Sequence, residues 1–274
     1  MLKNLGATQM QWTSIGLGTW MMEKNPVDSI SALHAGIDAG SNLIDTAEMY
    51  GDGQVEEIVG EAIKGVRDKI FLVSKVLPSN ATYEGTLKAC HRSLKRLQVD
   101  CIDTYLLHWR EPQVQLDETF RAFEKLKQQG KIRSWGVSNF TVSDLKDAVK
   151  IVGENKIVCN QVLYHLNERS IEFQLIPWCK EHKISVVAYS PLAQGKVPTH
   201  SVLTKIANQY QSTVSQVILS FLTREENVMA IPKSSDLNRT VENTESMKIQ
   251  LTASEIAEIQ KAFPAKSKAH LPML

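Results

Sequence analysis

The stretch Ile70-Phe71-Leu72-Val73-Ser74-Lys75 places a lysine directly after a run of residues that favours a buried β-strand. Asp45 and His108 follow two more runs of this kind, and Tyr50 lies five residues after Asp45. In a βα barrel the carboxyl ends of all strands lie at one face, which carries the working residues of such enzymes. The spacing therefore predicts that an amine, a carboxylate, an imidazole and a phenol meet at one end of a barrel.

Short apolar runs alternate with segments of helical period along the chain, which predicts the α/β fold class. Eight runs are expected to be strands, at residues 15–18, 42–45, 70–74, 102–107, 132–138, 157–161, 184–189 and 228–231. Their starts lie roughly 25–45 residues apart, as expected for a (β/α)8 TIM barrel in which a helix follows each strand. Since no linker or repeat divides the chain, residues 1–274 are expected to form a single barrel domain.

An open, doubly wound sheet is the competing arrangement. A dinucleotide-binding sheet of that kind normally carries the pattern G-x-G-x-x-G at its first turn. The pairs Gly16-x-Gly18 and Gly51-x-Gly53 both lack the third glycine of the pattern. The barrel is therefore the favoured architecture.

Local signals predict elements beyond the strands. Residues 2–12 are expected to form a short N-terminal hairpin. Asp28 and Thr141 are expected to cap helices, and residues 170–181 to form one helix. Extra helices are expected near the C-terminus, at residues 202–210, 214–223 and 253–262.

Bulk composition limits the partners of the chain. It has 274 residues, a formal net charge of +1 and 43% hydrophobic residues, so neither a nucleic acid nor a membrane is an expected partner. No secretory signal is visible, and no apolar run reaches the roughly 18 residues that a membrane helix needs. The four cysteines lack the spacing of a zinc site or a disulfide framework, so we expect no metal and a cytoplasmic location.

The four converging residues suit proton transfer to a carbonyl oxygen. A phenol has a pKa of about 10, which is high for proton donation at neutral pH. The ammonium of Lys75 is expected to lower the pKa of Tyr50, and Asp45 to hold Lys75 charged and oriented. His108 is expected to donate a hydrogen bond to a substrate oxygen while a hydride attacks the carbonyl carbon.

Later strands offer a place for a hydride carrier. By the two-residue period of a strand, Gly136 and Ser138 share one face, and such small residues leave space inside the barrel. Asn139 follows at the tip and can bind an amide, as can Gln161 at the end of the sixth strand. Tyr189 ends the seventh strand and offers a ring for stacking. Taken one at a time, each of these residues is more simply explained as an ordinary strand end or core aromatic.

The segment after the eighth predicted strand suits a phosphate. Barrel phosphate sites commonly use the loops after strands seven and eight together with a short extra helix. Lys233, Ser234 and Arg239 combine two cations with a hydroxyl near a helix start. A solvated helix start explains the same residues equally well.

The chain resembles the aldo-keto reductase family from about Ile15 to Phe263. Any one of the matching motifs would be weak evidence, but their order along the chain is highly specific. They are Gly18-Thr19-Trp20, Asp45-Thr46-Ala47-Glu48-Met49-Tyr50-Gly51, Ser74-Lys75, Leu106-Leu107-His108-Trp109, Gly136-Val137-Ser138-Asn139-Phe140, Asn160-Gln161-Val162, Tyr189-Ser190-Pro191-Leu192 and Ile231-Pro232-Lys233-Ser234.

The resemblance implies the NADPH-dependent reduction of aldehydes and ketones, with methylglyoxal and other small aldehydes as expected substrates. By resemblance, Tyr50 is the proton donor and Asp45, Lys75 and His108 complete the catalytic set. The residues implied in binding NADPH or NADP+ are Gly18, Thr19, Trp20, Asp45, Ser138, Asn139, Gln161, Tyr189, Ser190, Leu192, Gln194, Gly195, Lys233, Ser234, Arg239 and Asn243. Those expected to contact the substrate are Trp20, Tyr50, His108 and Trp109.

Two segments are shorter than in many members of the family. Residues 194–200 are short where a longer loop often covers the cofactor, and the tail after Pro264 is short and expected to be loosely ordered. A poorly walled pocket of this kind predicts broad specificity. The chain is expected to act as a monomer on a small-molecule carbonyl substrate.

Two other classes of function compete with a reductase. A lyase or aldolase would use Lys75 as a Schiff-base amine. A cofactor-sensing binding protein would use the same fold without turnover. The physiological substrate, the preferred direction of the reaction and the extent of NADH use stay open at the level of the sequence.

Overall fold

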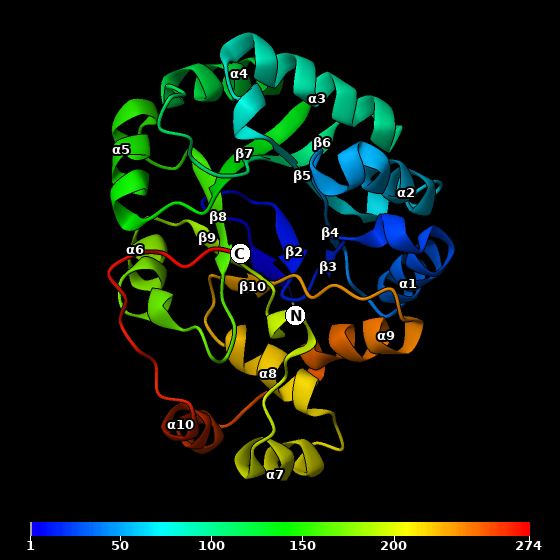
Figure 1. The fold of residues 1–274 in the computed structure, drawn as a ribbon, viewed down its shortest axis with the longest axis vertical. Coiled ribbons are helices and arrows are strands. Elements are labelled where there is room, and N and C mark those ends of the chain that lie inside the picture. Colours follow the sequence, from blue (N-terminus) through cyan, green and yellow to red (C-terminus); the bar gives the residue numbers. More distant parts are fainter. Residues whose placement is uncertain (1) are drawn as a thin grey trace.

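Eight parallel strands form a barrel at the centre of the computed structural model, which describes residues 2–274. Each strand pairs with the next one along the chain, so the sheet follows the sequence order (Figure 1). The strands are β3 (Leu17–Gly18), β4 (Leu43–Asp45), β5 (Phe71–Val76), β6 (Ile102–Leu107), β7 (Ile132–Ser138), β8 (Ile157–Leu163), β9 (Ser185–Tyr189) and β10 (Val228–Ala230).

Hydrogen bonds between the first and last strands close the barrel. Parallel bridges join Ile15 to Ala230 and Gly18 to Lys233. The Gly16 backbone N–H donates to the Ala230 carbonyl at 2.8 Å. A β-carbon at Gly18 would lie 2.7 Å from the Ile231 carbonyl oxygen, so only glycine lets the two strands approach this closely. The predicted (β/α)8 barrel is confirmed.

Helices surround the barrel on its outside (Figure 1). They are α1 (Pro26–Asp38), α2 (Gln54–Ala62), α3 (Tyr83–Leu97), α4 (Leu116–Gln128), α5 (Val142–Val152), α6 (Leu175–Glu181), α7 (Ser201–Gln209), α8 (Val214–Leu222), α9 (Leu237–Glu245) and α10 (Ala253–Ala262). The predicted extra helices near the C-terminus are present as α7, α8 and α10. Across residues 2–274, every helix is too short or too polar to cross a bilayer.

Two predicted helix boundaries are wrong. Asp28 does not cap α1, because Pro26 occupies the first turn and Asn25 is the N-cap residue; proline favours that position since its missing N–H costs nothing there. Residues 170–181 are not one helix: a 3-10 turn covers Ser170–Glu172, and α6 starts at Leu175. The Thr141 cap is confirmed, with its hydroxyl accepting from the Asp144 N–H.

The predicted N-terminal hairpin is confirmed and lies across the amino-terminal end of the barrel. Strands β1 (Leu2–Asn4) and β2 (Gln11–Thr13) pair antiparallel, with Lys3 opposite Trp12. The fully buried Trp12 ring packs against Phe71, the first residue of β5, with ring centroids 5.2 Å apart. Lys3 Nζ donates to the carbonyls of Thr223, Glu225 and Val228 at 2.5–2.7 Å. The hairpin thus closes the end opposite the ends of the strands that carry the candidate site.

Two apolar clusters place the site. The larger cluster lies between strands and helices, and the smaller one fills the barrel interior with Leu43, Val73 and Leu106 among its members. These three residues precede Asp45, Lys75 and His108 by two positions. Since side chains two apart on a strand share a face, the polar residues point into the barrel directly above its apolar filling.

Candidate active site

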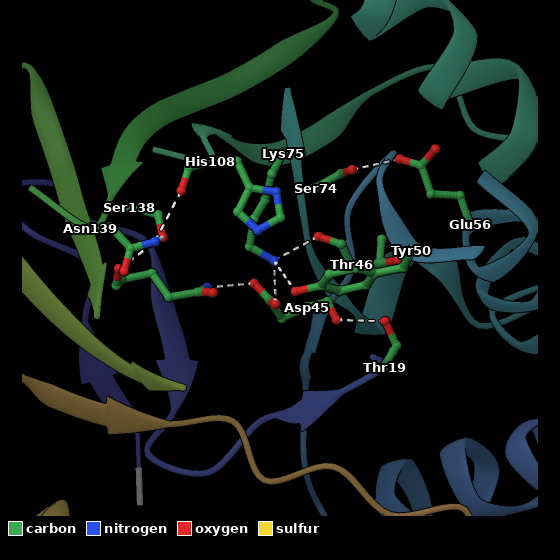
Figure 2. Close-up of polar contacts among 11 residues, drawn as sticks. Thr19, Asp45, Thr46, Tyr50, Glu56, Ser74, Lys75, His108, Ser138 and Asn139 are labelled. Atoms are coloured by element: carbon green, nitrogen blue, oxygen red, sulfur yellow. Dashed lines mark hydrogen bonds and ion pairs between the residues drawn. The ribbon is translucent and has the colours of Figure 1, made fainter. Parts of the chain in front are cut away.

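Lys75 is the hub of the polar cluster in the barrel mouth. Its Nζ donates to Asp45 Oδ1 at 2.5 Å, to the Thr46 carbonyl at 2.9 Å and to Tyr50 Oη at 3.3 Å. Figure 2 shows Asp45, Tyr50 and Lys75 pointing toward one another, with the His108 ring beside Lys75. The structure thus brings together all four residues that the sequence singles out for proton transfer.

Burial and charge together keep Lys75 protonated. The Lys75 side chain is fully buried, which by itself would lower its pKa, but the negative charge of Asp45 and the contact with Tyr50 more than compensate and raise the pKa. Burial also raises the pKa of Asp45 against the opposing effects of Lys75 and Gln161. The ammonium is therefore a fixed positive charge beside the phenol.

Tyr50 departs from the predicted direction of its pKa. Its pKa is raised, because loss of hydration outweighs the lowering by Lys75. The sequence shows that an ammonium is near the phenol but not how little water reaches it. Tyr50 therefore holds its proton at neutral pH, and Lys75 lies where it can stabilise the phenolate that forms once that proton leaves.

His108 is buried and neutral. Burial, followed by the positive charge of Lys75, lowers the pKa of His108 to about 3. Its ring centroid lies 5.9 Å from that of Tyr50 and 5.0 Å from that of Trp109. A neutral imidazole carries one N–H, so the ring retains the hydrogen-bond donor expected of it without adding charge.

The predicted amide-binding residues are linked by hydrogen bonds. Ser138 Oγ donates to the Gln161 carbonyl at 2.8 Å, and Tyr189 Oη donates to Asn139 Oδ1 at 3.1 Å. Asn139 Nδ2 donates to the His108 carbonyl at 3.2 Å. Gln161 Nε2 donates to Asp45 Oδ2 at 2.7 Å, a contact that joins this group to the proton-transfer cluster. Ser138, Asn139, Gln161 and Tyr189 therefore lie together beside Lys75 and His108.

Glu48 fixes the segment that carries Tyr50, and the sequence reasoning did not single it out. Glu48 Oε1 accepts from the Leu77 N–H at 2.8 Å and from Asn80 Nδ2 at 2.9 Å. The Glu48 N–H donates to the Lys75 carbonyl at 3.3 Å. An acidic residue two positions before the phenol, in a segment expected at the barrel mouth, was the available signal.

A left-handed turn follows Tyr50. Gly51, Asp52 and Gly53 have φ values of 54°, 51° and 92°. Two glycines and an aspartate adopt this region at less cost than other residues. The turn leads from Tyr50 directly into α2, so the two glycines support the position of the phenol.

The predicted phosphate residues lie at the start of α9. Gly18 is bridged to Lys233, and Ser234 Oγ donates to the Asp236 carbonyl at 3.1 Å. Arg239 is exposed, and its backbone N–H donates to Asp236 Oδ1 at 2.9 Å. A small hollow between α1 and this segment has Gly18, Ser234 and the buried Asn243 among its lining residues.

The remaining predicted cofactor residues lie along the segment after β9. Ser190 and Leu192 are half-buried, and Gln194 and Gly195 are exposed. Ser190 and Gln194 have positive φ values of 49° and 55°. This segment extends from Tyr189, beside the amide-binding residues, and the Thr19 hydroxyl donates to the Asp45 carbonyl at 2.8 Å on the opposite side of the mouth.

Aromatic side chains and the C-terminal tail border the site. Trp20 is 43% exposed and Trp109 is half-buried. The tail was expected to be loose, but Arg169 donates to the Phe263 carbonyl and Lys268 pairs with Glu168. The tail ends over the barrel mouth (Figure 1). These long-range contacts hold the first part of a tail that has no secondary structure of its own, and the broad specificity expected from a poorly walled pocket stays a prediction.

Histidine, cysteine, aspartate and glutamate side chains do not gather in groups of three or more that could hold a metal ion anywhere within residues 2–274.

Comparisons with known proteins agree with the geometry. The model of the aldo/keto reductase family matches residues 14–263. Methylglyoxal reductase YeaE of Escherichia coli is 43% identical over 270 residues, covering 95% of each chain, and glyoxal reductase of Bacillus subtilis is 39% identical, covering 92% of this chain and 88% of that protein. The crystal structure of an aldo/keto reductase from Klebsiella pneumoniae in complex with NADP and acetate is 43% identical, with a TM-score of 0.94 and 99% of each chain covered. The chain therefore belongs to the aldo/keto reductase family and is an oxidoreductase.

Proposed function

We propose that this protein reduces small aldehydes and ketones to alcohols with NADPH, and that Tyr50 donates the proton. The observation that carries the proposal is the placement of one buried ammonium, that of Lys75, against both the Asp45 carboxylate at 2.5 Å and the Tyr50 hydroxyl at 3.3 Å. The support from relatives is that structures of the family from Klebsiella pneumoniae contain NADP or NADPH.

The residues present fit a nicotinamide dinucleotide phosphate. The linked side chains of Ser138, Asn139 and Gln161 offer amide donors and acceptors, and the half-buried Tyr189 ring offers a stacking surface. At the start of α9, Lys233 and Arg239 are exposed cations close in sequence to the Ser234 hydroxyl. This set suits a phosphate. Further proposed contacts come from the end of β3, from the segment after β9 and from α9. They are Gly18, Thr19, Trp20, Ser190, Leu192, Gln194, Gly195 and Asn243.

In the proposed reaction the protein supplies the proton and the electrostatic environment. The nicotinamide, when bound, supplies the hydride to the carbonyl carbon. Tyr50 gives its hydroxyl proton to the carbonyl oxygen and becomes a phenolate, which the Lys75 ammonium stabilises. Asp45 keeps the Lys75 ammonium charged and in place. The neutral His108 ring donates a hydrogen bond to the carbonyl oxygen of the substrate. Tyr50 is then reprotonated from water.

Small dicarbonyl compounds such as methylglyoxal are the proposed substrates. Two relatives of 43% and 39% identity are named methylglyoxal reductase and glyoxal reductase. The Trp109 ring lies 5.0 Å from the His108 ring, and Trp20 and Met49 are exposed apolar side chains. Charged side chains at the centre of the site are paired or neutral. A small, uncharged carbonyl compound suits these surroundings.

The lyase alternative is less well supported. A Schiff-base lysine must be a neutral amine to attack a carbonyl carbon. Lys75 has a raised pKa and donates to three acceptors, so its nitrogen is held as an ammonium. Borohydride trapping of a carbonyl compound on Lys75 would revive this alternative.

We also propose that residues 1–274 act as one domain and as a cytoplasmic monomer. The support is that one apolar cluster extends without a break from Ile15 to Ile259. Light scattering that gives a mass near 30.7 kDa would agree with a monomer, whereas twice that mass would contradict it.

The test of the proposed function is a rate assay on the purified protein. Methylglyoxal, glyoxal and aromatic aldehydes would each be mixed with NADPH or NADH, and the loss of absorbance of the reduced nicotinamide followed. We expect turnover of the small dicarbonyls with a clear preference for NADPH. Cofactor binding without turnover of any carbonyl compound would instead favour the cofactor-sensing alternative.

A further inference from the structure

An unbroken chain of hydrogen bonds runs from Gln161 to Tyr50. Gln161 Nε2 donates to Asp45 Oδ2 at 2.7 Å, and the other oxygen of Asp45 accepts from Lys75 Nζ at 2.5 Å. Lys75 in turn contacts Tyr50 Oη at 3.3 Å. Gln161 lies 116 positions after Asp45 in the sequence, on the opposite side of the barrel. The two oxygens of one buried carboxylate are thus shared between the amide-binding side and the proton-transfer side.

The Gln161 side chain is held in this contact by its surroundings. Its backbone carbonyl accepts from both Ser138 Oγ and the Asn139 N–H at 2.8 Å. The residue is 2% exposed, so its amide has little room to turn away from Asp45. A buried amide that donates to a carboxylate makes a strong hydrogen bond because the acceptor is charged and water is excluded.

Asn139 provides the contrast within the same site. It also carries an amide, but that amide donates to the His108 backbone carbonyl and to Ser138 Oγ. The Asn139 side chain therefore reaches no charged group. Two amides proposed to serve the same ligand differ in whether they touch the proton-transfer residues.

We propose that Gln161 is a positioning residue for proton transfer: its amide holds Asp45 in the orientation that fixes Lys75 against Tyr50. The inference rests on the proposed role of Tyr50. It adds to the expected contact of Gln161 with the cofactor a second task that acts through Asp45.

The direction of the effect follows from charge balance. When the Gln161 donor is absent, one carboxylate oxygen has no partner, and the whole negative charge of Asp45 faces Lys75. This charge then cancels more of the positive field that Lys75 exerts on Tyr50, and the phenolate becomes harder to form. Proton transfer should therefore slow more than hydride transfer does. Loss of the Asn139 side chain removes an amide but leaves the charges of Asp45 and Lys75, and their effect on Tyr50, unchanged.

The first test is a double-mutant cycle on the cofactor-free protein, measured by urea unfolding. Gln161→Met keeps the length of the side chain and removes its donors, and Gln161→Leu replaces it if that variant does not fold. We expect Gln161→Met to raise the unfolding equilibrium constant about tenfold or more in the wild-type background and much less with Asp45→Asn. Asn139→Gly, which tolerates the φ of +59° at this position, should have the same effect in both backgrounds. Equal effects of Gln161→Met in both backgrounds would overturn the inference.

The second test separates proton transfer from cofactor placement. In Gln161→Met we expect kcat to fall about tenfold or more, with a larger solvent deuterium isotope effect on kcat. In Asn139→Gly we expect weaker NADPH binding and no increase in that isotope effect. A Gln161→Met variant with weaker NADPH binding but an unchanged solvent isotope effect would assign Gln161 to the cofactor alone and overturn the inference. Absence of turnover in the wild-type protein would instead contradict the proposed function, and the unfolding cycle would still report on the Gln161–Asp45 contact.

Discussion

Lys75 Nζ lies 2.5 Å from Asp45 Oδ1, and both side chains are buried at the mouth of the barrel. Asp45 is the last residue of β4 and Lys75 the last but one of β5, and these adjacent strands are paired in parallel register. A buried ion pair of this kind contributes little to stability as a pair, but a single partner left behind is an uncompensated buried charge. The pair therefore supplies a fixed positive charge for Tyr50 rather than stability.

We expect Lys75→Met to destabilise the fold by about 3–5 kcal/mol, because it leaves the Asp45 carboxylate buried without a counter-ion. The double variant Asp45→Asn with Lys75→Met should recover much of that loss, since both charges are then absent. Urea unfolding of the four proteins measures the coupling. Lys248→Met is the control: Lys248 is 71% exposed and its pairing with Glu245 should be worth less than about 1 kcal/mol. If the double variant lost as much free energy of unfolding as the two single variants together, the pairing of Lys75 with Asp45 would be contradicted.

We expect Tyr50→Phe to reduce carbonyl turnover by about 10²–10⁴-fold, because the variant lacks the proton donor. The dissociation constant of NADPH should change little, since the ring remains and only the hydroxyl is lost. Steady-state rates and fluorescence titration with NADPH measure the two quantities. Turnover within a few-fold of the wild type would refute the role of Tyr50.

Stability should depend on pH through His108. Burial and the charge of Lys75 lower the pKa of this imidazole from 6.5 to about 3 in the folded protein. The unfolded chain therefore binds a proton at a higher pH than the folded one, so the contribution of His108 is complete above pH 6.5 and is lost as the pH falls toward 3.

We expect the free energy of unfolding of the wild type to fall between pH 6.5 and pH 4 more steeply than that of His108→Asn, by at most about 1.4 kcal/mol per pH unit. Urea unfolding at a series of pH values measures this difference. His91→Asn, at an exposed position, should keep the wild-type slope. Identical slopes for wild type and His108→Asn would show that this imidazole is not desolvated.

We expect Arg239→Ala to weaken NADPH about 10–100-fold and NADH much less, because only NADPH carries the 2′-phosphate that an arginine can bind by charge-assisted hydrogen bonds. Equilibrium titration with both cofactors gives the ratio of their affinities. Arg121→Ala, at an exposed position on α4, is the control for a general loss of positive charge. Equal weakening of both cofactors would place Arg239 away from the 2′-phosphate.

The strands could be predicted because the apolar runs were short and each ended in a recognisable turn. Predicted and observed bounds agree closely for β6 and β7. The start of α1 and the break before α6 were missed because proline at residues 26 and 177 decides where a helix can begin, and that local rule outweighs the apolar pattern. No range was predicted for α9, whose sequence is polar over most of its length.

The site was predictable as a set of residues but not as a network. Asp45, Lys75 and His108 could be singled out because each directly follows or closes an apolar run that predicts a strand. The contact between Gln161 and Asp45 joins residues 116 positions apart and depends on barrel closure. The hydrogen bond from the Leu77 N–H to Glu48 and the ion pair between Lys268 of the tail and Glu168 are likewise long-range contacts that no local pattern contains.

The barrel and the four residues at its mouth could be predicted because strand period and chain order dictate which side chains point into a closed parallel sheet. The family resemblance could be predicted from the order of the motifs along the chain. The protonation states of the site residues depend instead on the folded environment. The amount of water excluded from Tyr50 and His108 depends on everything packed around them, and it reversed the expected direction of the Tyr50 pKa and made His108 neutral.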